Sequence, residues 1–349
     1  MTTEEILKLA EEFLRSEVGP KANLIDSDST ALGLALKGLC DRNLMALKRA
    51  PEYGGPAVDE VSFRTFQESV ARYSGSLAFL QTQHQSAVNM IGKCENEELK
   101  QRMLPQMGDG TLLVGIGFSQ LRRSGNPIMK AEHVEGGYML NGTVPWITGE
   151  SFFHEVLIGA ALPDGRGVFG VVPFQDTAEI RHSEPMKLAA MESARTVSAD
   201  YKNYFLPESE VVYVKPADWI HNNDMINITL QGFFALGCAR AGLDIVNRCW
   251  ETKRSPAIQE AWQSLDKEIS ECREKLFQAH SPIPKRLSTR AWAIDLAVRC
   301  AHAGVTATGG SAHSVSHDAQ RVYREALVYT VSAQTAPIME ATLSRLTRK

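Results

Sequence analysis

The sequence predicts an α+β protein whose helices and strands are segregated along the chain. Hydrophobic residues recur with a helical period up to Gly108 and again beyond Lys215. Between these two regions, β-branched and aromatic runs alternate with Gly, Pro and Asn-Gly turns. An all-α, all-β, all-α order favours separate layers over a parallel sheet with interleaved helices. Because 349 residues exceed one comfortable core, we expect three units, at residues 1–108, 109–214 and 215–349.

The first unit is predicted to be helical. Thr2–Glu5 offers a capping box at the start of the first helix. A second helix is expected from Leu32 to Leu47, before a breaker cluster at Ala50–Pro56, because a residue that precedes proline is disfavoured in the helical conformation. Helices resume over Val58–Arg102, and one of them carries His84.

The second unit is predicted to consist of strands and the third of long helices. The expected strands are Leu112–Ser119, Tyr138–Thr148, Glu155–Ala161, Gly167–Pro173 and Val197–Phe205. The expected helices are Phe233–Trp250, Trp262–Gln278, Arg290–Val305 and Asp318–Leu346.

The strand at Tyr138–Thr148 carries the strongest functional signal. Pro145 cannot donate to a central ladder, so Trp146, Ile147 and Thr148 are expected on an edge or at a bulge. An indole beside a hydroxyl on rigid backbone suits a flat heteroaromatic ligand, because the indole stacks while the hydroxyl bonds to the ring edge. The alternative is a Trp that fills the core beside an ordinary strand Thr.

Composition narrows the functional classes. The chain is 44% hydrophobic and 22% charged with a net charge of −4, which indicates neither a nucleic-acid nor a membrane partner. Six cysteines without a Cys-x-x-Cys pair indicate neither a zinc site nor a disulfide scaffold. No apolar run approaches the roughly 20 residues of a membrane span, and the N-terminus lacks a signal region, so we expect a cytoplasmic protein.

Several motifs, in order, resemble the acyl-CoA dehydrogenase superfamily over nearly the whole chain. Gly136–Thr148 reads Gly-Gly-Tyr-x-Leu-Asn-Gly-x-x-x-Trp-Ile-Thr, which is similar to that family's flavin-contact strand. Pro51–Gly55 is similar to its Pro-Glu-x-x-Gly-Gly motif, Gly309-Gly310 to its glycine turn, and Tyr323–Glu325 to its Arg-Asp pair. The resemblance implies a helical N-terminal domain, a β-barrel-like middle domain and a C-terminal four-helix bundle.

The resemblance also implies an FAD cofactor. In the family, the counterparts of Trp146 and Thr148 lie against the isoalloxazine ring, those of Phe118 and Ser119 meet its pyrimidine edge, and the glycine turn approaches the adenine and pyrophosphate of an FAD held by the neighbouring subunit. The predicted cofactor contacts are therefore Phe118, Ser119, Trp146, Ile147, Thr148, Gly309 and Gly310. From the residues alone, Gly309-Gly310 is equally a plain interhelical loop. Arg122-Arg123, just beyond Ser119, suits either a phosphate or a solvated loop.

The catalytic base is where the chain departs from the family. A carboxylate there removes the α-proton of a thioester while the flavin accepts the β-hydrogen as hydride. Counted from the Arg-Asp motif, that Glu falls on Ala333 and the following Gly on Gln334, and the second place some members use falls near Asn227. The sequence is thus identified as a divergent member that lacks the usual Glu.

Three residues remain as candidates for catalysis: His84, Arg324 and Gln334. A neutral imidazole such as that of His84 titrates near neutrality, although a lone helical His is usually structural. Arg324 is interpreted as an ion-paired scaffold residue, because a guanidinium stays protonated. His313 and His317 lack a Glu-x-x-His context and are not expected to bind a metal.

The resemblance implies an FAD-dependent oxidoreductase that oxidises a small-molecule substrate, an acyl-CoA or a carrier-bound acyl thioester, with an unspecified electron acceptor. Two alternatives stay open, a flavin-dependent monooxygenase and a non-catalytic FAD-binding relative. A homodimer or homotetramer is implied as well. The segment Asp244–Gly309 looks short and Lys253–Pro256 replaces a loop that reaches a partner's cofactor, so we expect the dimer.

Overall fold

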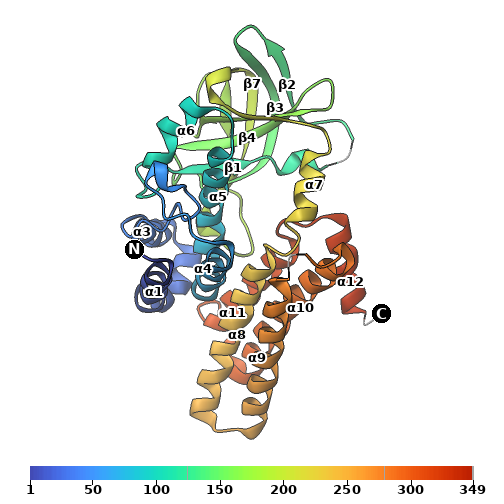
Figure 1. The fold of residues 1–349 in the computed structure, drawn as a ribbon. Helices are drawn as coiled ribbons and strands as arrows, with labels where there is room; N and C mark the ends of the chain where they lie inside the picture. The colour runs from blue at the N-terminus through green and yellow to red at the C-terminus, as the bar shows by residue number, and fades with distance from the viewer. Residues whose placement is uncertain (124, 279, 348–349) are drawn as a thin grey trace.

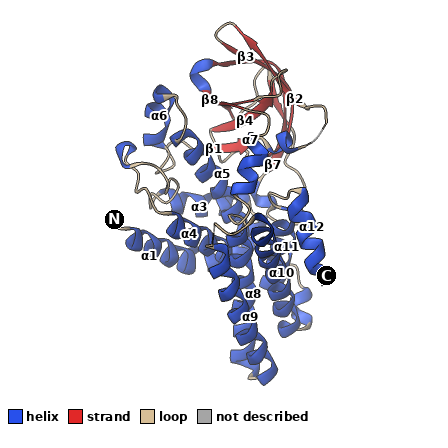
Figure 2. Ribbon diagram, turned by 45° about the vertical axis from the view of Figure 1, so that its right-hand side comes forward, coloured by secondary structure: helices blue, strands red, loops and turns tan. Residues whose placement is uncertain are grey.

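The computed structural model describes residues 1–123, 125–278 and 280–347. Figure 1 shows a helical N-terminal part, a sheet at one end of the molecule and a long helical bundle that extends away from it. The strands gather apart from the helices in the second view as well (Figure 2). The predicted α+β class and the order of its parts are thereby confirmed. No helix within the described ranges is long and apolar enough to cross a membrane.

The N-terminal part contains the helices α1 (Thr3–Phe13), α2 (Ala22–Ser27), α3 (Ser29–Cys40), α4 (Glu60–Tyr73), α5 (Gly75–Gly92) and α6 (Glu97–Met103). The predicted capping box is present, because the Thr2 side chain accepts from the Glu5 amide and the Glu5 carboxylate accepts from the Thr2 amide. The helix expected to reach Leu47 ends at Cys40 instead. Asn43 turns the chain with a φ of 54°, and the apolar run that follows it is buried without being helical.

The middle part is an eight-stranded sheet in the order β6-β7-β3-β2-β4-β5-β8, with β1 paired to β4. The strands are β1 (Val114–Gly117), β2 (Met129–Val134), β3 (Gly137–Thr148), β4 (Glu155–Ala161), β5 (Gly167–Pro173), β6 (Ile180–His182), β7 (Thr196–Pro207) and β8 (Val211–Lys215). The bounds of β4 and β5 are those predicted, whereas β2, β6 and β8 were not anticipated. The pattern of β2, with Met129 and Ala131 buried between exposed charged residues, is a regular strand signal.

A β-bulge interrupts β3 where Pro145 stands. In the pairing of β3 with β7, Val144 lies opposite Ala199 and Ile147 lies opposite Val197, so β3 contains one extra residue. This confirms the expectation that the Trp-Ile-Thr segment lies at an edge or a bulge.

The C-terminal part contains the helices α7 (Trp219–Ile226), α8 (Gly232–Lys253), α9 (Pro256–Leu276), α10 (Ile283–Thr308), α11 (Asp318–Val331) and α12 (Ala336–Leu346). Helices α8 to α11 pack together as a bundle, and α12 lies against α10 (Figure 1). The single helix expected over Asp318–Leu346 is wrong, because a turn at 332–335 separates α11 from α12. Ala333 has a φ of 47° there, and Pro337 in the first turn of α12 has no N–H to continue the earlier helix.

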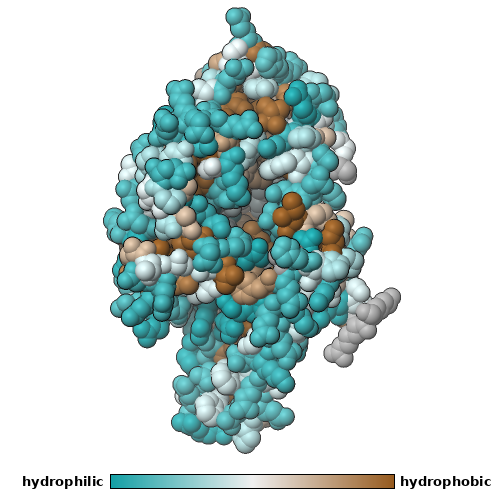
Figure 3. Space-filling model, in the orientation of Figure 1, coloured by the Kyte–Doolittle hydropathy of each residue, from teal (hydrophilic) through white to brown (hydrophobic). Residues whose placement is uncertain are grey.

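One hydrophobic cluster runs through all three parts of the chain. Its fully buried members include Leu77 of α5, Ile147 of β3 and Leu236 of α8. The outer surface is mostly hydrophilic, with separate hydrophobic patches on the sheet and at its junction with the helices (Figure 3). The shared core therefore holds the sheet and the bundle in a defined relation, which positions the candidate site.

Candidate functional site

Two glycines let β1 cross closely over the end of β3. A Cβ added to Gly117 would lie 3.0 Å from Ile147 Cγ1 and 3.1 Å from Val144 Cγ1. A Cβ on Gly115 would lie 3.5 Å from the Thr148 carbonyl oxygen. The Gly-x-Gly pattern of this strand is therefore a packing feature, and it brings the end of β1 beside the end of β3.

The side chains at these two strand ends differ in what they offer a ligand. Trp146, at the bulge, is 46% exposed, and Ser119, just past β1, is exposed beside a half-buried Phe118. Ile147 is fully buried, and the buried Thr148 hydroxyl lies 3.0 Å from the Thr196 hydroxyl. An indole face and a free hydroxyl are thus open to solvent, which fits a flat heteroaromatic group.

The predicted glycine turn follows α10 and is open. Gly309 has a φ of 84° and a ψ of −151°, a conformation that favours glycine. Nothing lies within 4 Å of a Cβ built on Gly309 or Gly310, and both residues are exposed. The Lys253 ammonium donates to the Thr308 carbonyl, 3.0 Å away, and so caps α10 directly before the turn. The turn leaves room for close approach by a group from outside the chain.

His84 is bonded to the start of β1 and to the loop before it. Its Nδ1 accepts a hydrogen bond from the Val114 amide at the start of β1 (2.9 Å), and its Nε2 donates to the Met107 carbonyl (2.8 Å). The residue is fully buried, and burial lowers the pKa of the imidazole to about 4. Because both ring nitrogens are engaged by backbone groups, neither is available to accept a substrate proton.

Arg324 of α11 joins two other parts of the chain. Its guanidinium lies 2.7 Å from Asp26 Oδ2 of α2, and it also donates to the Ala189 carbonyl at 3.0 Å. These contacts are those of an ion-paired residue that fixes α11 against its surroundings.

The α11–α12 turn, residues 332–335, carries the position expected for the base. Ala333 and Gln334 are both exposed, and the Gln334 amide donates only weakly to the Thr330 carbonyl at 3.4 Å. Beneath the turn, the fully buried Arg290 donates to the Ser332 carbonyl at 3.1 Å. Arg290 forms no salt bridge with any residue that the structure describes, and burial lowers the pKa of its guanidinium to about 9. The turn offers no carboxylate.

Comparison with known proteins gives one answer throughout. The family model described as the acyl-CoA dehydrogenase N-terminal domain matches residues 2–111. A probable acyl-CoA dehydrogenase of Bacillus subtilis, YngJ, is 22% identical over 97% of this chain and 96% of its own length. The family model, the relatives and the fold all indicate the acyl-CoA dehydrogenase superfamily. Its members are FAD flavoproteins, so the chain is grouped with flavin-dependent oxidoreductases of the acyl-CoA type.

Two further proteins are similar to this chain over nearly its whole length. The 3-(aryl)acrylate reductase of Clostridium sporogenes is 20% identical over 98% of this chain and 97% of its own. The fold of glutaryl-coenzyme A dehydrogenase, solved as a complex with glutaryl-CoA, matches with a TM-score of 0.84 at 18% identity and covers 99% of this chain and 95% of that one. The exposed indole, the free hydroxyl and the open glycine turn are compatible with the family's cofactor.

Helix α7, which sequence reasoning missed, forms an ion pair with the segment that follows β1. Arg122 forms two hydrogen bonds with the Asp224 carboxylate of this helix, at 2.8 and 2.9 Å. The guanidinium considered as a phosphate ligand is therefore paired within the chain, whereas Arg123 is exposed. Asn227, the second place considered for a base, follows the end of α7 and donates its amide to the Asn223 carbonyl at 2.9 Å. Eight residues without strong periodicity left no clear helical signal for α7.

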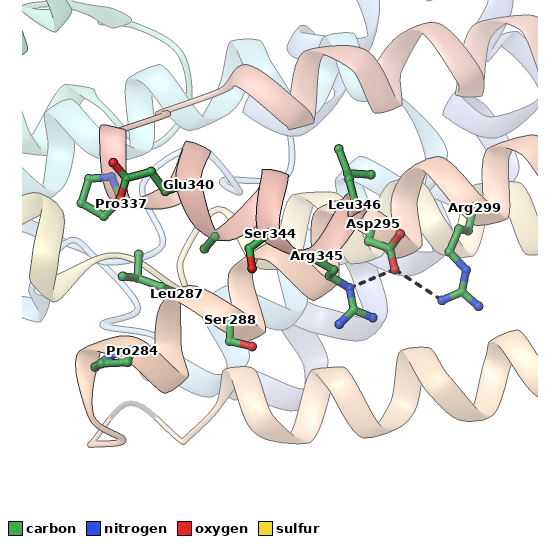
Figure 4. A pocket seen from close by; sticks show the side chains of 11 residues that line it. Pro284, Leu287, Ser288, Asp295, Arg299, Pro337, Glu340, Ser344, Arg345 and Leu346 are labelled. Carbon is green, nitrogen blue, oxygen red and sulfur yellow. Dashed lines mark hydrogen bonds and ion pairs between the residues drawn. The ribbon is translucent and has the colours of Figure 1, made fainter. Parts of the chain in front are cut away.

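A pocket of the helical part lies away from these residues. A pocket of about 1100 Å³ runs between α10 and α12, and Figure 4 shows Asp295 between Arg299 and Arg345 along its wall. None of the predicted flavin contacts lines it.

His317, which was not expected to bind a metal, caps α11, because its Nδ1 accepts a hydrogen bond from the Ala319 amide.

Proposed function

We propose that this protein is an FAD-dependent oxidoreductase that oxidises an acyl thioester or a related substrate. The observation that carries the proposal is the exposed Trp146 at the β3 bulge, beside Ser119, on an acyl-CoA dehydrogenase fold. Trp146 would stack on the flavin ring, and Phe118, Ser119, Ile147 and Thr148 would line its edge through side-chain or backbone groups. Bound FAD would supply hydride acceptance.

The other end of the cofactor would lie near the glycine turn. Gly309 and Gly310 would approach the adenine and pyrophosphate of FAD held by a second copy of the chain, since an open turn with a φ of 84° at Gly309 allows close backbone contact. Lys253 would keep this turn at the end of α10 through its bond to the Thr308 carbonyl. We therefore propose a homo-oligomer, a dimer in preference to a tetramer, located in the cytoplasm.

Some apolar side chains of α11 are exposed and would support association. Phe233, Phe234 and Val322 are buried inside the bundle, whereas Leu327 and Val331 of α11 are 53% and 61% exposed. Sedimentation at micromolar concentration tests the proposal: a dimer is expected, and monomer alone would contradict it.

Proton handling is the step for which the chain offers least. Ala333 and Asn227 carry no acidic group, and both nitrogens of His84 are already bonded to backbone. Arg324 would position α11, and Gln334 would line the turn without accepting a proton. We expect slow α-proton removal from ordinary saturated acyl-CoA, since a positioned base contributes roughly 10²–10⁴-fold.

The lack of an acidic group at Ala333 and Asn227 also favours a second candidate, a flavin-dependent monooxygenase on this fold. Reaction of reduced flavin with O₂ needs no carboxylate at the α-carbon of a thioester, so Ala333 would be no handicap. A non-catalytic FAD-binding relative is the third outcome.

One experiment separates the three functions. The visible spectrum of the FAD-loaded protein is followed anaerobically while a panel of acyl-CoA thioesters is added. Bleaching of the flavin band supports the dehydrogenase. Bleaching only with an external reductase, followed by reoxidation in air with substrate turnover, supports the monooxygenase. Flavin that responds to neither treatment supports the non-catalytic relative.

A further inference from the structure

Asp26 joins all three parts of the chain at one carboxylate. The residue lies on α2 and is only 3% exposed. Its Oδ1 accepts from the Met191 amide of the sheet part at 3.0 Å and from the Ser76 hydroxyl of α5 at 3.2 Å. Its Oδ2 lies 2.7 Å from the Arg324 guanidinium of α11. One oxygen of this buried carboxylate therefore binds the sheet part and α5, and the other binds α11.

The Met191 contact reaches a strained turn. Met191 and Arg195 have φ values of 57° and 49° on either side of the short 3-10 turn Glu192–Ala194. Left-handed conformations in residues other than glycine cost free energy and persist only where neighbouring contacts impose them. Here Asp26 binds the amide at one end of the turn, and Glu150 binds the guanidinium of Arg195 at the other, at 2.6 Å.

This turn underlies the end of the strand that faces the proposed flavin. The Gly149 amide donates to the Ala194 carbonyl at 3.0 Å. Thr196, the next residue but one, pairs with Thr148 in the sheet, and their hydroxyls lie 3.0 Å apart. A shift of the turn would therefore move Thr148 directly.

The contact with Arg324 connects Asp26 to α11, the helix that ends at the α11–α12 turn. Arg324 also donates to the Ala189 carbonyl at 3.0 Å, two residues before Met191. Its neighbour Glu325, fully buried, is bonded to Arg321 at 2.9 Å and accepts from the Gly75 amide at 3.1 Å. Helix α11, which ends at the α11–α12 turn, is held to α2 and α5 through these adjacent positions.

We propose that Asp26 is a positioning residue that sets the placement of the flavin-facing end of β3 relative to the α11–α12 turn. Its Oδ2 holds Arg324 of α11, and its Oδ1 holds the Met191 amide beneath the end of β3. The strand end and the helix are therefore both fixed to Asp26. The effect on chemistry rests on the proposed function, because the spacing matters to a reaction only if flavin and substrate occupy the site.

The test is Asp26→Asn, with Asp244→Asn as the matched control. The amide keeps an oxygen for Met191 but loses the charge that holds Arg324. Asp244 of α8 also accepts two hydrogen bonds, at 2.7 and 2.8 Å, from Arg72 of α4, so it joins the same two helical parts without touching the sheet. We expect Asp26→Asn to raise the FAD dissociation constant about tenfold and to shift the flavin absorption band, because the neutral amide no longer holds the partly exposed Arg324 guanidinium by charge. The control should change the FAD dissociation constant less than about twofold, and its loss of Tm should be smaller because the Asp244–Arg72 pair is partly exposed.

Equal changes in FAD affinity for the two variants would overturn the proposal and leave Asp26 as an ordinary structural tie. If Asp26→Asn does not fold, Arg324→Gln replaces it, with Arg324→Lys as the conservative rescue, because a lysine keeps the charge opposite Asp26. Rescue by lysine supports the proposal, and failure of lysine to recover any FAD affinity contradicts it.

Hydrogen exchange of the FAD-free protein keeps this test separate from the proposed function. Asp26→Asn should speed amide exchange in both 187–196 and 331–336, and Asp244→Asn in neither. A wild type that binds no FAD would refute the proposed function alone. Unchanged exchange in either segment of Asp26→Asn would refute the coupling, whatever the protein binds.

Discussion

The end of β3 that carries Trp146 and the α11–α12 turn are held in opposite ways. The strand end is embedded in a ladder with β7 and backed by a neutral, fully bonded His84, and it presents the indole of Trp146 outward. The turn exposes Ala333 and Gln334 above Arg290, a buried cation with one hydrogen bond to a carbonyl. The features suited to a flavin are thus built into a rigid element, whereas the position for a base carries a methyl group. Under the proposed function, cofactor binding and proton transfer would therefore depend on different elements of the chain.

The largest expected effect comes from giving the turn its missing carboxylate. Ala333→Glu together with Gln334→Gly should speed anaerobic flavin bleaching by acyl-CoA roughly 10²–10⁴-fold, because a positioned base contributes about that factor. The glycine leaves room for the thioester, and Ala333→Gln with Gln334→Gly is the uncharged control. Stopped-flow absorbance measures the rate. Rapid bleaching by the wild type that survives His84→Ala would show that another carboxylate does this work.

The support of the strands should show in the dependence of stability on pH. The pKa of His84 is about 4 in the folded protein and about 6.5 when unfolded, so the unfolded chain takes up a proton first as the pH falls. The free energy of unfolding should therefore decrease between pH 6.5 and 4, by roughly 3 kcal/mol from this residue. Urea unfolding of the wild type and of His84→Gln at pH 7 and 4.5 measures it. The same decrease in both proteins would contradict the assignment.

Loss of the indole should weaken flavin binding without disturbing the turn. Trp146→Ala removes a large stacking surface, and we expect a roughly tenfold increase in the FAD dissociation constant. Trp146→Phe, which keeps an aromatic face, should lose less. Fluorescence titration with FAD measures both, and unchanged affinity in Trp146→Ala would remove the flavin assignment of this strand.

The smallest effect is expected on stability, from replacing Arg290 beneath the α11–α12 turn. Arg290→Met replaces a buried cation that has no salt-bridge partner among the described residues by an apolar side chain, and it should leave stability unchanged or raise it by about 1 kcal/mol. Urea denaturation at pH 7 measures this. A large destabilisation in Arg290→Met would mean that its single bond to Ser332 organises the turn.

Much of the fold could be predicted because its signals are local. The period of hydrophobic residues indicated the helical and extended regions, and the bounds of β4 and β5 followed from apolar runs between turn residues. Pro145 alone indicated the bulge beside Trp146, since proline cannot donate to a ladder. The break between α11 and α12 was missed, although Pro337 marks it, because the apolar spacing on either side continues the helical period.

The sequence by itself determined the order of the parts, the bulged strand with its indole, and the absence of a carboxylate at residues 227 and 333, because each depends on residue identity and near neighbours. Only the tertiary structure decided that both nitrogens of His84 are bonded to backbone, that Arg122 is paired with Asp224, and that Arg290 has no counter-charge among the described residues. It also decided that Asp26, Met191 and Arg324 meet. Those properties are set by hydrogen bonds and burial between residues far apart in the chain, which no local pattern encodes.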